Sequence, residues 1–147
     1  MRLDRDFSEF IGLLRAHDVR FLIVGGYAVA VHGHPRYTGD LDVWVLVDPI
    51  NVDRLLRVLD DFGFGAVGLS RDDFLEPDNV VQLGYPPLRI DLLTSLDGVD
   101  FNECYPHRVE VDLGEVTAPF ISLADLRRNK TASARPQDLA DLQALAD

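Results

Sequence analysis

The run Phe21–Val24 is short, continuous and apolar, and it ends at the glycine pair Gly25-Gly26. Such a run is typical of a strand that is buried on both faces of a sheet. Tyr27–Val31 is rich in alanine, and Gly33 lies just beyond it. These residues predict a short helix directly after the glycine turn. A strand, a tight turn and a helix in this order favour an α/β fold.

The spacing of apolar residues predicts the other elements. Helices are expected over 7–14, 52–62 and 122–132, with Asn51 and Ser122 as N-caps, and a last helix from Arg135-Pro136 carries Leu139, Leu142 and Leu145. Strands are expected over 41–47, 80–83, 88–93 and 108–116. We predict a single domain over residues 1–147, with C-terminal helices over about 122–146. Its fold is α/β, a mixed, mainly antiparallel twisted sheet flanked by helices.

The composition limits the partners of the protein. A formal net charge of −11 over 147 residues repels nucleic acid and anionic lipid as a whole. Because no run approaches the roughly 20 apolar residues of a membrane span and the start lacks a signal-peptide pattern, we predict a soluble, cytoplasmic protein. Four basic residues gather near the C-terminus, at Arg127, Arg128, Lys130 and Arg135. They form either a phosphate-facing edge or a solvated helix end.

Two carboxylates one residue apart, Asp40 and Asp42, stand at the start of the valine-rich strand. Side chains alternate along a strand, so both project from the same face. Two like charges held together are costly without a cation, and paired carboxylates suit Mg²⁺ or Mn²⁺. Asp91 lies in the apolar run Arg89–Leu93, where an unpaired charge is hard to explain. We therefore predict a metal site formed by Asp40, Asp42 and Asp91.

Gly25 and Gly26 predict a phosphate pocket when they are combined with the paired acids. Glycine lets the backbone approach a triphosphate, and a helix N-terminus offers free N–H groups. A Gly-Gly turn alone is more often a packing feature. Its joint occurrence with Thr38-Gly-Asp40-Leu-Asp42-Val-Trp44 favours a functional reading.

Val24-Gly25-Gly26 and Arg36-Tyr-Thr-Gly-Asp40-Leu-Asp42-Val43 together resemble the signature of the DNA polymerase beta-like nucleotidyltransferases. That signature is a Gly-Gly or Gly-Ser turn, an Asp-Xaa-Asp strand and a distal aspartate. The gap between the glycines and the acids, with the Arg-Xaa-Thr-Xaa-Asp lead-in, is more similar to the bacterial branch that contains AbiEii-type toxins. The resemblance covers most of the chain.

The resemblance implies transfer of a nucleoside monophosphate from a nucleoside triphosphate, such as ATP, to an acceptor hydroxyl, with Mg²⁺. Carried over by position, Asp40 and Asp42 would bind the metals. Asp91 would bind the second metal and help to deprotonate the acceptor. Gly25 and Gly26 would hold the triphosphate.

Three further positions and the partners follow from the same resemblance. Arg36 and Thr38 would orient phosphates or the acidic loop, and Lys130 matches a basic position in the C-terminal helix of similar proteins. The acceptor would be a protein, an RNA or a small hydroxylated molecule, and the acidic surface disfavours tRNA. A cognate toxin or antitoxin is a further expected partner.

Two other functions fit the same residues. One is a non-catalytic nucleotide- or partner-binding module, such as an antitoxin or regulatory subunit. The other is a metal-dependent phosphohydrolase, which would release inorganic phosphate instead of pyrophosphate. A zinc site at His32 and His34 is a weaker alternative, because no cysteine cluster or third histidine lies nearby in sequence. Trp44 shares the face of Asp42, and core packing is favoured over base stacking.

Overall fold

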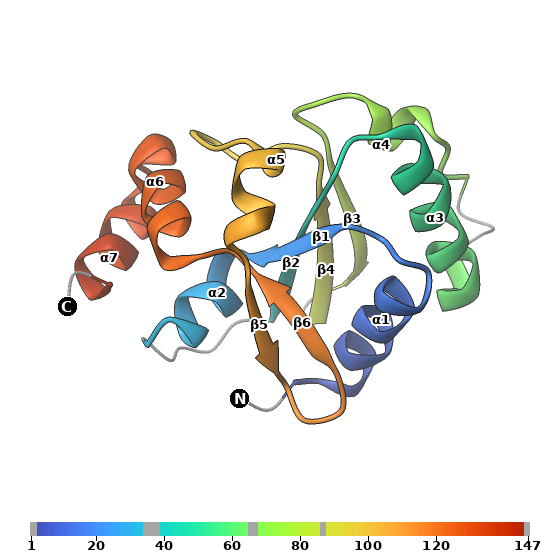
Figure 1. Ribbon diagram of the computed structural model, residues 1–147, viewed down its shortest axis with the longest axis horizontal. Helices are drawn as coiled ribbons and strands as arrows, with labels where there is room; N and C mark the ends of the chain where they lie inside the picture. The colour runs from blue at the N-terminus through green and yellow to red at the C-terminus, as the bar shows by residue number, and fades with distance from the viewer. Residues whose placement is uncertain (1–2, 34–38, 65–67, 86–87, 146–147) are drawn as a thin grey trace.

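The computed structural model describes residues 3–33, 39–64, 68–85 and 88–145, which form one sheet with helices around it (Figure 1). The strands are β1 (Phe21–Val24), β2 (Asp40–Val45), β3 (Val80–Tyr85), β4 (Leu88–Leu93), β5 (Val109–Asp112) and β6 (Thr117–Phe120). The helices are α1 (Arg5–Ala16), α2 (Gly25–Val31), α3 (Pro49–Leu59), α4 (Asp72–Leu75), α5 (Phe101–Cys104), α6 (Leu123–Ser133) and α7 (Pro136–Ala144), with short helical turns η1 (Asp60–Phe64) and η3 (Tyr105–His107). None of the helices in these ranges combines the length and apolar composition that crossing a membrane requires.

The sheet is mixed, with the strand order β3-β4-β2-β1-β6-β5. β1 is antiparallel to β2 and parallel to β6, while β2 is parallel to β4. β3 with β4 and β5 with β6 form antiparallel pairs. All four residues of β1 are buried, as its continuous apolar run predicts. The predicted α/β class with a mixed, mainly antiparallel sheet is confirmed.

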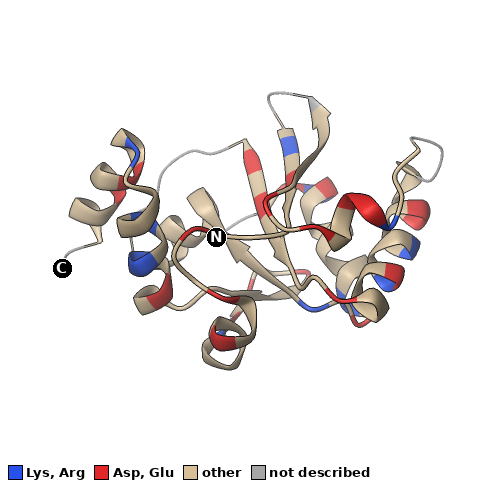
Figure 2. Ribbon diagram, turned by 90° about the horizontal axis from the view of Figure 1, so that it is seen from above, with Lys and Arg blue, Asp and Glu red and all other residues tan. Residues whose placement is uncertain are grey.

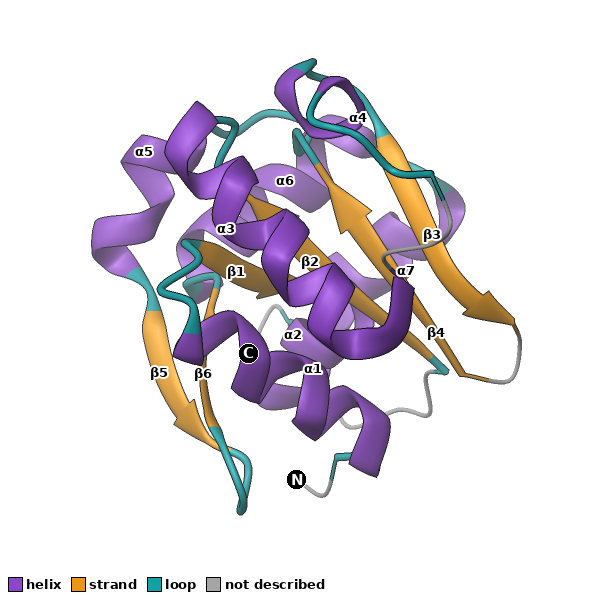
Figure 3. Cartoon of the chain, turned by 90° about the vertical axis from the view of Figure 1, so that its right-hand side faces the viewer, coloured by secondary structure: helices purple, strands orange, loops and turns teal. Residues whose placement is uncertain are grey.

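Helices α1 and α3 lie side by side over one face of the sheet (Figures 1 and 3). The buried face of α1 includes Phe7, Phe10, Ile11 and Leu14, the residues whose spacing predicts this helix. The Phe10 ring meets the edge of Phe62 in η1, with ring centroids 5.0 Å apart. At the opposite end of the molecule α6 and α7 form a separate helix pair (Figure 1).

The start of α3 differs from the sequence prediction. Asp48 caps the helix, because its carboxylate accepts hydrogen bonds from the N–H groups of Ile50 and Asn51, each at 3.1 Å. Asn51 is buried inside the helix, and its side-chain amide donates to the carbonyl oxygens of Arg20 (3.1 Å) and Leu46 (2.9 Å). The predicted Asn51 N-cap was wrong, since this side chain joins α3 to the neighbouring strand ends.

The strand predicted over 108–116 is present as β5 but ends at Asp112, because the chain then turns into the antiparallel strand β6. The carboxylate of Asp112 accepts a 2.8 Å hydrogen bond from the N–H of Gly114, which has a φ of 99°. β6 then pairs with β1 as well as with β5, so it lies inside the sheet. Pro119 made this strand hard to predict, because proline is typical of sheet edges.

Helix α7 is present as predicted, but it buries a different face. Leu145 just beyond the helix is buried, whereas Leu139 is 54% exposed. The carboxylates of Asp138 and Asp141 are turned inward instead, and these residues are 1% and 2% exposed. Two acids three residues apart on a helix are normally exposed to solvent. Because Asp138 and Asp141 are buried, their charges require partners inside the protein.

Candidate active site

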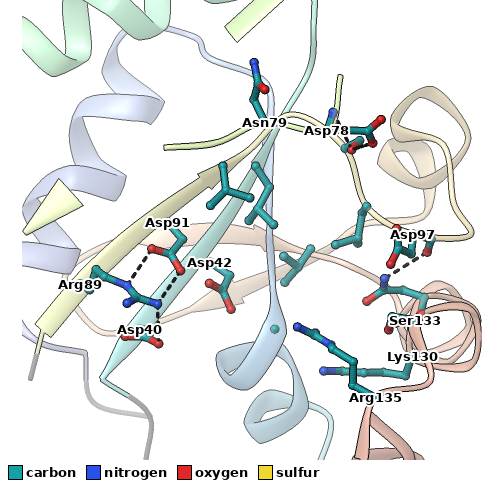
Figure 4. A pocket seen from close by; sticks show the side chains of 17 residues that line it. Asp40, Asp42, Asp78, Asn79, Arg89, Asp91, Asp97, Lys130, Ser133 and Arg135 are labelled. Carbon is teal, nitrogen blue, oxygen red and sulfur yellow. Dashed lines mark hydrogen bonds and ion pairs between the residues drawn. The ribbon is translucent and has the colours of Figure 1, made fainter. Parts of the chain in front are cut away.

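The parallel pairing of β2 with β4 brings the predicted carboxylates together. In the register of these strands Asp42 lies opposite Asp91, and Asp40 lies opposite Arg89. Because side chains two residues apart share a face, all four side chains project from one side of the sheet. Figure 4 shows them side by side on the two strands. The three aspartates that the sequence proposes as a unit are therefore neighbours in the fold.

Arg89 lies between two of these aspartates. Its Nη2 atom is 3.2 Å from an oxygen of Asp40 and 3.1 Å from one of Asp91 (Figure 4). Its Nε atom is 2.9 Å from the other oxygen of Asp91, an ion pair without hydrogen-bond geometry. The hydrogen bond and the charge of Asp91 raise the pKa of Arg89 above its ordinary value. The guanidinium thus balances part of the negative charge of Asp40 and Asp91.

Arg89 forms its ion pairs with Asp40 and Asp91, whereas Asp42 lies against Gly25 at the start of α2. Burial, followed by the negative charges of Asp91 and Asp40, raises the pKa of Asp42 to about 7. The positive charges of Lys130 and Arg89 lower this pKa by less. The ionised form of Asp42 is therefore costly in the folded protein, and a nearby cation would stabilise it.

Gly25 makes the position of Asp42 feasible. Its φ is +68°, a left-handed conformation that glycine adopts readily. A Cβ atom at this position would lie 2.0 Å from Oδ2 of Asp42 and 3.1 Å from its Cβ. Gly26, the next residue, is buried in the first turn of α2. The turn therefore has a steric role toward Asp42, in addition to the nucleotide-binding role predicted from the sequence.

The aspartates form one side of a pocket of about 740 Å³. Figure 4 shows its other sides, which come from the segments around β3 and β4 and from α6. The polar side chains there belong to Asp78, Asn79, Ser95, Asp97, Asn129, Lys130, Ser133 and Arg135. A volume of this size is typical of sites for small ligands. Apart from Lys130 and Arg135, these polar residues lack a motif and were not predicted.

Lys130 is buried in the wall of this pocket. Its Nζ atom lies 3.1 Å from an oxygen of Asp138 and 3.1 Å from an oxygen of Asp141, which explains the inward acids of α7. Burial raises the pKa of Asp138, but hydrogen bonds from Arg135, Ser133 and Lys130 outweigh burial and hold that pKa well below its ordinary value. The predicted nucleotide contact of Lys130 stays a prediction, and its present partners are the two acids.

The C-terminal basic cluster divides into two parts. Lys130 and Arg135 line the pocket, as a phosphate-facing edge requires. Arg127 instead donates to the carbonyl oxygen of Leu145, and Arg128 pairs with Asp125. The four residues therefore do not form one continuous edge, because helix periodicity directs them to different sides.

Several predicted residues have other outcomes. Arg36, Thr38 and His34 lie outside the described residues. The Nε2 atom of His32 donates a 2.7 Å hydrogen bond to the carbonyl oxygen of Ile121, a structural contact at the end of α2. Trp44 is buried and meets the edge of the Phe101 ring at 5.1 Å between centroids, so its predicted place in the core is confirmed.

The carboxylates of Asp40, Asp42 and Asp91 are the type of ligand that a hard divalent cation prefers, but their oxygens do not converge on one point. Within the described ranges no three His, Cys, Asp or Glu side chains converge closely enough to hold a metal ion as they stand. Asp40 and Asp91 turn toward Arg89, while Asp42 turns toward Gly25. Mg²⁺ prefers carboxylate oxygens, and these three lie on adjacent strands. Binding requires the carboxylates of Asp40 and Asp91 to turn away from Arg89.

Replacing Arg89 by glutamine tests this competition. We expect Mn²⁺ to bind roughly two- to fivefold more tightly to the variant, since the guanidinium no longer competes for two carboxylates. Isothermal titration calorimetry measures the affinity, and Arg71→Gln, which removes an exposed ion pair with Asp53, is the control. Weaker binding in Arg89→Gln would show that the arginine orients the carboxylates for the metal.

Replacing Lys130 by methionine is expected to destabilise the protein by about 3 kcal/mol, because the buried carboxylates of Asp138 and Asp141 lose its ammonium group while Asp138 keeps Arg135. Urea denaturation followed by circular dichroism measures the free energy of unfolding. The variant that also carries Asp138→Asn and Asp141→Asn removes both carboxylate charges and should recover part of the loss. A decrease below about 1 kcal/mol in the single variant would mean that water reaches the acids.

The mixed sheet carries Asp-Xaa-Asp and a third aspartate on neighbouring parallel strands, beside a Gly-Gly turn, which is the arrangement expected from the resemblance to nucleotidyltransferases. A family model matches residues 1–146. The chain belongs to that family, DUF6036, described as nucleotidyltransferases of unknown function. No curated protein sequence matches the chain significantly.

Solved structures share the fold at low sequence identity. An antigenic nucleotidyltransferase-like protein from Paracoccidioides brasiliensis has a TM-score of 0.57 and 19% identity, over 94% of this chain and 72% of that one. A nucleotidyltransferase-type protein from Thermotoga maritima has a TM-score of 0.59 and 14% identity, over 99% and 94%. The lincosamide antibiotic adenylyltransferase LnuA, with lincomycin bound, has a TM-score of 0.58 and 13% identity, over 99% and 98%. These likenesses concern the fold.

Proposed function

We propose that the protein is an Mg²⁺-dependent nucleotidyltransferase that moves a nucleoside monophosphate from a nucleoside triphosphate, such as ATP, to an acceptor hydroxyl. The observation that carries this proposal is the register of β2 and β4, in which Asp40, Asp42 and Asp91 share one face above a pocket. Membership of a nucleotidyltransferase family supports the reaction class. Lys130 and Arg135 also line the pocket, where both pair with acids of α7.

Asp40, Asp42 and Asp91 would hold the metal. Bound Mg²⁺ would neutralise the carboxylates and stabilise negative charge on the phosphate oxygens during the displacement. The raised pKa of Asp42 supports this assignment, because ionising this buried group beside two others requires a compensating cation.

The protein's own residues then have separate tasks. Asp91 accepts the proton of the acceptor hydroxyl, whose oxygen bonds to the α-phosphorus as the bond to the β-phosphate oxygen breaks. Pyrophosphate leaves, and Arg135 lies at the pocket wall where it meets this negative charge. Gly25 and Gly26 are proposed to hold the triphosphate, while the roles of Arg36 and Thr38 stay predictions of the sequence.

The acceptor is proposed to be a protein or an RNA, as the sequence suggests. The AbiEii-type assignment and a role with a cognate toxin or antitoxin stay predictions. A pocket of about 740 Å³ also admits a small hydroxylated molecule as the acceptor. LnuA is by its name an adenylyltransferase of lincosamide antibiotics, which are small molecules. The second candidate function is a non-catalytic binding module. The ion pairs of Arg89 favour it, because they satisfy two carboxylates without a metal.

Labelled nucleotides test the proposal. The protein is incubated with Mg²⁺, each α-labelled nucleoside triphosphate in turn, and cell extract, and the label is followed in the RNA, protein and small-molecule fractions. We expect transfer with release of pyrophosphate, and no transfer by Asp42→Asn. Release of inorganic phosphate would instead indicate a phosphohydrolase. Absence of Mg²⁺-dependent nucleotide binding in calorimetry would favour the non-catalytic module.

A further inference from the structure

A second pocket, of about 480 Å³, lies at the end of β1 that is remote from the candidate active site. It is lined by four arginines from different parts of the chain: Arg15 of α1, Arg20 before β1, Arg54 of α3 and Arg108 before β5. β1 begins at Phe21 beside this pocket and ends at Val24, which lines the first one. The two pockets share no lining residue.

The charge of this arginine pocket opposes that of the whole protein. The chain has a formal net charge of −11, and acidic residues are spread over many of its elements (Figure 2). In the arginine pocket four guanidinium groups face only two carboxylates, those of Asp18 and Glu110, among the lining residues. The excess of two positive charges makes this pocket attractive to an anion.

Two of the four guanidinium groups share one carboxylate, and two pair with none among the described residues. Arg15 and Arg108 each lie 3.0 Å from a different oxygen of Glu110. Arg54 donates to the carbonyl oxygen of Asp18 at 3.3 Å. Within the described residues, neither Arg20 nor Arg54 pairs with a carboxylate. Their charges are therefore available to a ligand.

Tyr105 keeps part of the pocket in place before any ligand arrives. Its ring stacks on Phe101, with centroids 5.4 Å apart and an angle of 19° between the rings. The guanidinium of Arg108 lies 4.2 Å from the Tyr105 centroid, and that of Arg20 lies 5.6 Å from it. Side chains that are held in position lose less entropy when they bind a ligand.

We propose that the arginine pocket binds the phosphate or diphosphate group of a small molecule. Guanidinium groups bind phosphate oxygens through paired, charge-assisted hydrogen bonds, and the volume suits a compact ligand. A nucleic acid fits less well, because the formal net charge of −11 of the whole protein repels an extended phosphate backbone. This inference concerns a site separate from the proposed transfer reaction and does not depend on it.

Calorimetry with pyrophosphate in the absence of divalent metal tests this proposal on the full chain. In the double variant Arg20→Gln, Arg54→Gln, the affinity for pyrophosphate is expected to fall by about tenfold or more. The control Arg57→Gln, Arg71→Gln removes the same charge outside the pocket and should bind as the wild type does. The variant Arg89→Gln, Arg135→Gln, altered in the first pocket, should also keep this binding event.

A second measurement uses the wild type and does not depend on how the variants fold. Pyrophosphate should shift the Nε–Hε NMR signals of Arg20 and Arg54. Shifts confined to Arg89 and Arg135, or equal losses of affinity in the pocket and control variants, would overturn the proposal. It would likewise be overturned if a short oligoribonucleotide bound at Arg20 and Arg54 while pyrophosphate did not.

Discussion

Replacing Asp42 by asparagine is expected to abolish nucleotidyl transfer and, at the same time, to stabilise the metal-free protein. Transfer should fall by about a thousandfold or more, because the variant loses a metal-binding carboxylate. The gain in stability follows from the cost of ionising Asp42, whose pKa burial and the neighbouring charges of Asp91 and Asp40 raise to about 7. Function and stability therefore make opposite demands on this residue.

The difference in stability between Asp42→Asn and the wild type depends on pH. The folded protein binds the Asp42 proton more tightly than the unfolded chain does. The stability that this proton gives the folded wild type is therefore fully present below the ordinary pKa of 3.8. It is lost as the pH rises through about 7. The rise of the Asp42 pKa from 3.8 to about 7 corresponds to at most about 4 kcal/mol of unfolding free energy. Partial access of solvent to the carboxylate reduces this to about 2 kcal/mol. Asp42→Asn should therefore exceed the wild type in stability at pH 8 and approach it at pH 5.

Urea denaturation at both pH values, in the presence of a metal chelator, measures this difference. Asp40→Asn is the matched control: the Asp40 side chain is 45% exposed and pairs with Arg89, so its loss should bring no stabilisation at pH 8. If Asp42→Asn were destabilised at pH 8, the ionised carboxylate would have stabilising partners that outweigh its burial. Added Mg²⁺ should stabilise the wild type and leave Asp42→Asn unchanged.

Replacing Gly25 by alanine is expected to separate activity from stability. The added Cβ atom would stand 2.0 Å from Oδ2 of Asp42, so that carboxylate must move. We expect transfer to fall by about a hundredfold or more, because a displacement of about 1 Å at a reacting group has an effect of this size. The free energy of unfolding should fall by only about 1–2 kcal/mol, the cost of alanine in a left-handed conformation.

Gly114→Ala is the control for Gly25→Ala. Gly114 also has a positive φ, 99°, but a Cβ atom there would meet no heavy atom within 4 Å. Both variants should therefore lose similar stability in urea, and only Gly25→Ala should lose transfer and Mn²⁺ binding. Full activity in Gly25→Ala would mean that Asp42 functions in a different rotamer from the one seen here.

The strands and the aspartates could be predicted from the sequence because both depend on local pattern. The apolar run Phe21–Val24 marks a buried strand wherever it lies, and alternation places Asp40 and Asp42 on one face before any tertiary structure is known. Asp91 was proposed because a charge in an apolar run needs a partner. Its register opposite Asp42 was not encoded locally, since it depends on which strands pair.

The features that were mispredicted depend on partners remote in the sequence. Asparagine is a preferred N-cap residue, but the side chain of Asn51 instead donates to the carbonyl oxygens of Arg20 and Leu46. The inward orientation of Asp138 and Asp141 was not predicted, because it depends on Lys130 of another helix. The arginine pocket could not be predicted from the spacing of residues in the sequence, because its four arginines come from separate segments.

The contact between Gly25 and Asp42 also has a consequence for the evolution of the family. A side chain at position 25 would collide with the carboxylate at position 42, so the two positions should vary together among relatives. Members that keep the aspartate are expected to keep the glycine. Members that replace the aspartate by a smaller residue become free to accept asparagine or aspartate at position 25, residues that tolerate the left-handed conformation. The residue at position 25 would then distinguish lineages that retain the acid from those that have lost it.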